Sequence, residues 1–447
     1  MASVAVTYAN IVLYAISYQL QRPVEPFLTI GSPLIGILLD RIGVRKTSIL
    51  VYFASAASYW ILANATSTHW LYLSKVPTIF QHAFLVGQAT VASASARKSS
   101  AGGDKQRAVA LGRMTTAYTI GATIGPALGG YLAMGDLFAG ARLAIWGSIL
   151  SIILSIIFLK DRNNNSERTE GNKTNSDSQK VHVQQSFLQS IHKTISYLRH
   201  PTIGPLLFIK LLNGVSSSAF TTVLPLVLVN KLHLNTSQLG YFMSASSLSV
   251  AVYASFGISF SMSLVGNRSD RLASLGIANR IVSIVCFGGV VSWCLLHLRV
   301  DETTENEHLV PKEGIWVATI ASIAVSISSH MHATSLTTLT TGAVSTEQRG
   351  AILGLEHGLF SLARVVGPPF GTYLLSRPVT MMSEFMVESG FAGIWGVISA
   401  CVIMDVILFV CLRLWSGKQE IQQMNSSECI GLTEVSDDAH NEHDHSD

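Results

Sequence analysis

Long apolar runs separated by short polar segments dominate the chain. A helix needs about 20 mostly apolar residues to cross the hydrocarbon core of a bilayer. Eleven runs reach that length, and the predicted membrane-spanning helices cover residues 3–22, 47–64, 70–94, 110–133, 140–159, 203–229, 238–264, 281–298, 314–341, 351–375 and 391–412. A twelfth apolar segment, residues 29–39, has only half the length and ends at Asp40. The pattern predicts an all-α polytopic membrane protein with eleven full spans and a truncated second helix.

Composition agrees with this pattern, because 49% of the residues are hydrophobic and only 13% are charged. A soluble domain carries about 25% charged residues, so this chain lacks the polar surface that water requires. The five cysteines have no metal-ligand spacing, and no nucleophile, metal cluster or phosphate loop stands at usable spacing. We therefore predict no enzyme activity, no cofactor and no metal site.

The distribution of Lys and Arg predicts the orientation, since cytoplasmic loops carry an excess of both. If the N-terminus is cytoplasmic and the short segment still crosses, most basic residues lie on the cytoplasmic side, Arg107, Arg280 and Arg349 among them. The acidic residues 301–307 then lie outside. The expectation is a multi-pass protein of the plasma membrane or an endomembrane, with both termini in the cytoplasm.

An internal repeat relates the two halves of the chain. Residues 105–133 and 347–375 align at an offset of 242 positions, with identical pairs that include Arg107/Arg349, Gly112/Gly354, Gly125/Gly367 and Gly129/Gly371. A parallel repeat of this kind predicts a substrate site near the bilayer midplane between the halves. The predicted organisation is a first half at 1–159, a linker at 160–202 that includes an amphipathic helix at 186–200, a second half at 203–412 and a cytoplasmic tail at 413–447.

The repeat also exposes a difference in length. Ile203 to Asp270 spans 67 positions, whereas Val4 to Asp40 spans 36, which is 67 − 36 = 31 fewer. The first half is predicted to lack the loop after its first helix and much of the second helix. A skipped exon or a faulty gene model is favoured over a functional design.

A charged turn with the sequence GILLDRIGVRK occupies residues 36–46. Gly36 lets helices approach, Asp40 ends a helix, Gly43 permits a tight turn, and Arg45 and Lys46 stay at the cytoplasmic surface. This stretch resembles the signature loop between helices 2 and 3 of the major facilitator superfamily. The resemblance implies a gating latch at Asp40 and Arg41, with a degenerate copy at Asp270 and Arg271. Val44 stands where the family has a basic residue, and a purely structural turn is the alternative.

The fifth predicted span carries glycines at a spacing of four, which form a smooth packing face, and a proline that bends the helix. These residues are Gly121, Gly125, Pro126, Gly129 and Gly130. They resemble the fifth-helix motif of antiporters in the same superfamily, which implies exchange. A packing face without that role is the alternative.

Further stretches resemble one branch of the superfamily, the organic-cation-transporter-like protein 2 group (solute carrier family 22 member 18-like). They are SKVPTIFQHAFLVGQ at 74–88, SQLGYFMS at 237–244 and SLARVVGP at 361–368. The resemblance implies exchange of organic cations and drugs for protons by alternating access. The implied partners are a small solute, protons and the lipid bilayer, without nucleic acid. A transport-inactive sensor or scaffold derived from a transporter is the alternative.

Ionisable side chains inside the spans cost about 2.5–3.5 kcal/mol on insertion scales and usually face a cavity. Lys75 and His82 lie seven residues apart in the fourth predicted span, so they share a helix face, and Gln88 lies near it. This track is predicted to bind solute or relay protons. Interhelical hydrogen bonding, or snorkelling of Lys75 to the interface, is the alternative.

The eleventh span carries Glu356, His357 and Arg364. Arg364 needs a partner, for which Glu356 and Asp405 are the candidates, and a titrating His or Glu beside a fixed Arg is a plausible proton-coupling element. A static ion pair explains the same residues equally well. Glu25, next to Pro26, is a candidate acid that would offset the positive charge of the cavity.

Overall fold

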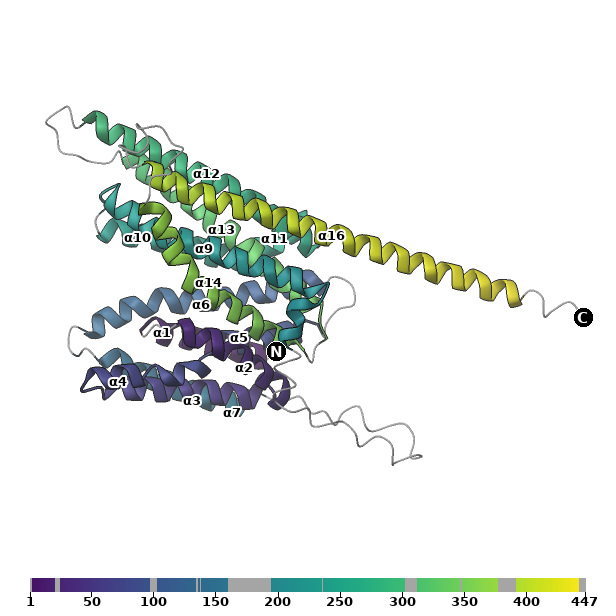
Figure 1. Cartoon of the computed structure of the whole chain (residues 1–447). Helices are drawn as coiled ribbons and strands as arrows, with labels where there is room; N and C mark the ends of the chain where they lie inside the picture. Colours follow the sequence, from purple (N-terminus) through teal and green to yellow (C-terminus); the bar gives the residue numbers. More distant parts are fainter. Residues whose placement is uncertain are drawn as a thin grey trace, which may run out of the picture.

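The computed structural model is helical and consists of two bundles (Figure 1). It describes residues 2–20, 25–96, 103–133, 136, 138–159, 194–234, 236–301, 312–345, 348–376 and 391–441, and no strand occurs among these residues. The predicted all-α architecture is thereby confirmed for the described part of the chain.

The first half contains α1 to α7. Its elements are α1 (Ala2–Leu20), α2 (Glu25–Ile42), α3 (Val44–Ala63), α4 (Thr68–Leu73), the 3₁₀-helix η1 (Val76–Phe80), α5 (Ala83–Ala96), α6 (Gly103–Ala133) and α7 (Ala139–Phe158).

The second half contains η2 to α16. Its elements are the 3₁₀-helix η2 (Tyr197–Arg199), α9 (Ile203–Asn230), α10 (Thr236–Val252), the π-helix η3 (Tyr253–Gly257), α11 (Ile258–Leu264), α12 (Ser269–Asp301), α13 (Lys312–Gly342), α14 (Arg349–Ser376) and α16 (Phe391–Asn441).

Among the described residues, six helical stretches are both long and apolar enough to cross a membrane. They are Ala139–Phe158, Ile203–Asn230, Phe242–Leu264, Ser269–Leu296, Gly314–Gly342 and Ala392–Ile421. Their outward faces carry large apolar side chains, such as Trp146 at 70% and Phe256 at 76% exposure. Large apolar side chains on the outer faces of these helices suit contact with lipid, which agrees with an integral multi-pass membrane protein.

The second helix is longer than the sequence pattern predicted. α2 begins at Glu25 and has 18 residues, which span about 27 Å at 1.5 Å per residue. That length nearly matches a hydrocarbon core of about 30 Å. The half-length expectation at 29–39 is corrected, because the helix extends towards its N-terminus past Pro26, where hydropathy alone gives no signal.

The fourth predicted span is interrupted rather than continuous. α4 ends at Leu73, η1 includes Pro77 near its start, and Gln81 has a non-helical ψ of 60° before α5 begins at Ala83. The expectation that Lys75 and His82 share one face of a regular helix is therefore wrong. Lys75 lies immediately before η1 and His82 immediately before α5.

Some predicted boundaries also move. The helix predicted at 281–298 begins at Ser269, and α16 continues past residue 412 to Asn441, protruding from the bundle in Figure 1. Most of the predicted linker and amphipathic helix, residues 160–193, lies outside the described residues. Ile195 and Leu198, at the end of that helix, are exposed.

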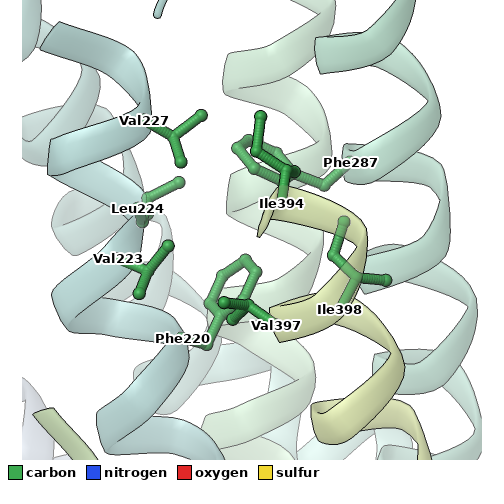
Figure 2. A pocket seen from close by; sticks show the side chains of 8 residues that line it. All are labelled: Phe220, Val223, Leu224, Val227, Phe287, Ile394, Val397 and Ile398. Atoms are coloured by element: carbon green, nitrogen blue, oxygen red, sulfur yellow. The ribbon is translucent and has the colours of Figure 1, made fainter. Parts of the chain in front are cut away.

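The interior of the second half is tightly packed. Figure 2 shows side chains of α9, α12 and α16 around a small apolar cavity of about 10 Å³. A cavity needs about 10–15 Å³ to hold one water molecule, and polar groups contribute almost nothing to this wall. This space is therefore part of the core and cannot accommodate an organic solute.

Candidate functional site: the interface between the two halves

The halves meet at two close helix crossings, and the first joins α2 to α14 (Figure 1). A Cβ atom at Gly36 would overlap the carbonyl oxygen of Gly350, and one at Gly354 would lie 2.6 Å from the carbonyl oxygen of Ser32. Only glycine permits backbones to approach so closely. Gly36 of the signature loop therefore has the packing role that the sequence predicted for it.

The second crossing joins α6 to the π-helix η3 and its neighbours. A Cβ atom at Gly112 would lie 2.5 Å from the carbonyl oxygen of Ala254. The hydroxyl of Thr116 donates to the carbonyl oxygen of Ala251 at 3.1 Å and lies 2.9 Å from the hydroxyl of Ser255. Gly112 and Gly354 are an identical pair of the internal repeat, so each half contributes the same glycine to a crossing.

Asp40 connects the halves at the end of the bundle where α2 ends and α14 begins, here called the Asp40 end. Its two carboxylate oxygens accept hydrogen bonds from the backbone N–H groups of Gly350 at 2.9 Å and Ala351 at 2.7 Å. An acidic side chain satisfies the free N–H groups of a helix N-terminus and complements its dipole. Asp40 thus caps a helix of the opposite half.

Two arginines of the repeat cross the interface at the same end. Arg107 of α6 donates to the carbonyl oxygen of Thr338 in α13 at 3.1 Å. Arg349 of α14 donates to the carbonyl oxygens of Ala92 in α5 at 3.3 Å and of Thr341 at 3.1 Å. The sequence places both arginines between predicted spans, but both are buried. Each binds one carbonyl oxygen near the C-terminal end of a helix in the other half, and Arg349 binds a second one in its own half.

A polar contact lies farther along α14. The Nε2 atom of His357 lies 2.6 Å from Oε1 of Gln88 in α5, and the His357 ring packs edge-on against Phe84. Phe84 packs in turn against Tyr118 of α6. The structure thus brings together His357 and Gln88, two predicted site residues from opposite halves, beside two aromatic rings.

His82 lies close by, in the break between η1 and α5. Its Nδ1 atom is 3.2 Å from the hydroxyl of Ser32 in α2, and its buried Nε2 atom has no hydrogen bond of good geometry among the described residues, although the ring interacts with the backbone of Ile79. The neighbouring Gln81 donates to the hydroxyl of Tyr59 at 2.9 Å. An unsatisfied buried ring nitrogen next to a helix break is a candidate position for a ligand or a proton.

Glu356 forms an ion pair with Lys210 of α9, and it also accepts a hydrogen bond from Thr340 of α13. Lys210 donates to Thr337 of α13 at 2.5 Å. Glu356 is 4% exposed. The prediction that Glu356 pairs with Arg364 is corrected, because a cation from another helix, Lys210, holds this carboxylate.

Asp405, the other predicted partner of Arg364, is bound by a different cation. Arg280 lies 3.4 Å from Asp405 and donates to Asn213 and Ser216 of α9 at 2.8 Å each. Asn213 also lies 2.5 Å from Nε2 of His332 in α13. Arg280 is 1% and Asp405 0% exposed. The expectation that Arg280 lies on the cytoplasmic side, just before a span predicted to begin at residue 281, is corrected, because α12 begins at Ser269 and Arg280 lies inside it.

The remaining predicted residues lie elsewhere. Arg364 is an exposed residue of α14 whose guanidinium lies 4.9 Å from the centre of the Phe360 ring. Glu25 is the first residue of α2. Asp270 accepts hydrogen bonds from Arg268 and Ser416. Arg271 lines a groove between α12 and α16. The described contacts of this degenerate copy therefore stay within the second half.

The last predicted site residues are four residues of the signature loop and the five residues of the glycine face on α6. Gly43 precedes α3 and has a φ of 87°, as a tight turn requires. Arg41 lies two residues before Gly43, and Arg45 and Lys46 lie two and three residues after it, all at the Asp40 end. Gly121 and Gly125 are buried in α6, whose helix continues through Pro126, Gly129 and Gly130. Gly367 and Gly371 are the repeat copies of Gly125 and Gly129, and they pack on Ser218 and Ala219 of α9.

Two helical halves that meet at paired glycine crossings, with polar residues between them, define a polytopic membrane protein of the two-bundle transporter class. The family model described as Major Facilitator Superfamily matches residues 9–305 of the 447. The chain therefore belongs to the Major Facilitator Superfamily, whose members carry small solutes across membranes, and the resemblance drawn from its motifs is confirmed.

Relatives agree with this assignment. Solute carrier family 67 member A1 of Homo sapiens is 23% identical over 354 residues, covering 77% of this chain and 74% of that protein. Solute carrier family 22 member 18 of Mus musculus is 24% identical over 362 residues, covering 77% of each. The crystal structure of the human organic anion transporter MFSD10 (TETRAN) has a TM-score of 0.60 at 14% identity, covering 92% of this chain and 99% of that one. At that identity the likeness concerns the fold.

Proposed function

We propose that the protein is a secondary active transporter that moves small organic solutes, in the first instance organic cations, by proton-coupled exchange. The observation that carries this proposal is the contact between His357 and Gln88, which joins the halves beside Phe84 and Tyr118. Aromatic rings with a few polar groups suit an organic solute. A solute bound there would touch both halves, as alternating access requires.

The Asp40 end is proposed to be the cytoplasmic gate, closed in this structure. Asp40, Arg107 and Arg349 each bond the backbone of the opposite half. All three would lose these partners if the halves separated there. Gly121 to Gly130 would support the exchange geometry by letting α6 move against its neighbours.

The coupling site is proposed to be Glu356, whose partners reach the gate. Lys210 and Thr340 hold the Glu356 carboxylate, and Thr340 lies on the same turn of α13 as the carbonyl groups that bind Arg107 and Arg349. Protonation of Glu356 would break its ion pair and change the packing of this turn. Proton binding could thereby influence the gate.

The test is uptake of a cationic dye into proteoliposomes under an imposed pH gradient. His357→Ala should lower uptake roughly tenfold, as the loss of a hydrogen bond of about 1.5 kcal/mol predicts. His69→Ala removes an exposed histidine of α4 and should leave uptake unchanged. Glu356→Gln should abolish the response to the gradient while solute binding persists.

The same assay separates the alternatives. Uptake of an anionic dye in place of the cationic one would overturn the substrate class. Wild-type protein that moves neither dye under any gradient would favour the transport-inactive sensor or scaffold. Equal uptake by the wild type and His357→Ala would remove the proposed site.

A further inference from the structure

A groove on the outside of the second half, between α12 and α16, combines basic and apolar residues. Its volume is about 410 Å³, and its lining residues are Arg271, Ser274, Leu275, Ala278, Phe409 and Arg413. The transport proposal does not use this groove. We propose that it binds one anionic phospholipid, whose phosphate lies between Arg271 and Arg413 and whose acyl chain follows the apolar floor.

The two arginines lie at one level of the bundle. The hydroxyl of Ser416 in α16 donates to Asp270 in α12 at 2.6 Å, which places the start of α12 beside the residues that follow Arg413. Both arginines are exposed. Guanidinium groups bind phosphate oxygens with two parallel hydrogen bonds, and two of them at one level provide a site for a single headgroup.

The apolar part of the groove lies one helical turn deeper on both helices. Leu275 and Ala278 follow Arg271 by four and seven residues, which places them on the same face of α12. Phe409 precedes Arg413 by four residues on α16, and the Arg413 guanidinium lies 5.3 Å from the centre of its ring. A charged rim above an apolar floor matches the two parts of a phospholipid, whereas a free phosphate ion would use only the rim.

The acidic residues nearby are already engaged. Asp270 and Glu420 both pair with Arg268 at 2.7 Å, and these two carboxylates raise the pKa of the Arg268 guanidinium. Within the described part of the chain, neither Arg271 nor Arg413 has a carboxylate ion-pair partner. Their positive charge is therefore available to a lipid anion, and basic pockets between helices at the membrane surface recognise such headgroups.

The experiment measures lipid retained by the purified full-length chain, using native mass spectrometry after delipidation. The probes are phosphatidylserine and phosphatidylcholine with identical acyl chains. The wild type should retain phosphatidylserine preferentially, and Arg271→Gln/Arg413→Gln should reduce that retention by roughly 10- to 30-fold. Lys418→Gln is the matched control, because Lys418 follows Arg413 by five residues and so points about 140° away around the helix.

A second variant tests the apolar floor without changing charge. Ala278→Trp fills the groove below the arginines and should also reduce phosphatidylserine retention, whereas soluble glycerophosphoserine should compete weakly. Equal losses in Lys418→Gln and the double variant, no loss in either, or full retention in Ala278→Trp would overturn the proposal. None of these measurements depends on transport.

Discussion

At the scale of single residues, the buried ion pair of Arg280 and Asp405 supports the second half. A guanidinium does not lose its proton in proteins, so Arg280 must be satisfied wherever it is buried. Asp405 of α16 and Asn213 and Ser216 of α9 supply its partners, and Asn213 continues to His332 of α13. One charge on α12 thereby connects four helices, which favours movement of this half as a unit.

Asp405→Asn should lower the free energy of unfolding by about 3–5 kcal/mol, because it leaves the Arg280 charge buried without a counter-ion. Arg142→Gln opens a chemically similar pair with Asp136, whose Arg side chain is 61% exposed, and should cost at most about 1 kcal/mol. Unfolding can be followed in detergent with a thiol-reactive dye, since Cys294 and Cys401 are buried. The uncharged double variant Arg280→Gln/Asp405→Asn should be more stable than Asp405→Asn alone. A double variant less stable than that single one would contradict the argument.

At the scale of elements, the sequence predicted what hydropathy and the repeat determine. The second-half helices follow from apolar length, Gly112 and Gly354 are marked by the repeat, and Gly36 and Asp40 by the signature loop. That Asp40 caps α14 of the opposite half is visible only in the structure. Helix breaks and the tertiary partners of buried charges do not follow from these signals. An apolar window averages over Pro77 and the turn at Gln81. A predicted span that begins just after Arg280 cannot show that α9 and α16 supply the partners of this charge. Glu356 was assigned to Arg364 because sequence separation along one helix is visible, whereas the approach of Lys210 on α9 depends on tertiary packing.

The crossing of α2 and α14 gives a prediction for an element. Gly354→Val would place side-chain atoms against the backbone of Ser32 and Gly36, and overpacking of this kind costs about 1–3 kcal/mol. The closed Asp40 end should therefore open more often. A cysteine introduced at the buried Ala92 should then react with a polar thiol reagent at least about fivefold faster.

Gly289→Val is the matched control for that change, since Gly289 of α12 has no atom within 4 Å of its added Cβ. Labelling at position 92 should remain at the wild-type rate in this variant. Faster labelling in both variants would indicate general loosening of the bundle and would argue against a specific role for the crossing.

At the scale of the whole molecule, alternating access requires that the halves move relative to each other while each half keeps its packing. The structure offers one pair of hydroxyls between the halves and one within a half at similar distances. Thr116 of α6 lies 2.9 Å from Ser255 of η3, across the interface. Ser246 of α10 lies 3.2 Å from Ser322 of α13, inside the second half.

Replacing each pair with cysteines therefore tests the proposed movement directly. Oxidation of Thr116→Cys/Ser255→Cys should arrest dye uptake and reduction should restore it, because the disulfide would hold the α6 crossing closed. Oxidation of Ser246→Cys/Ser322→Cys should leave uptake nearly unchanged, because it joins helices that move together. The single variant Thr116→Cys reports any effect of the five native cysteines. Continued uptake with the inter-half disulfide fully formed would show that transport does not need this crossing to open, and the rocking of two rigid halves would have to be abandoned.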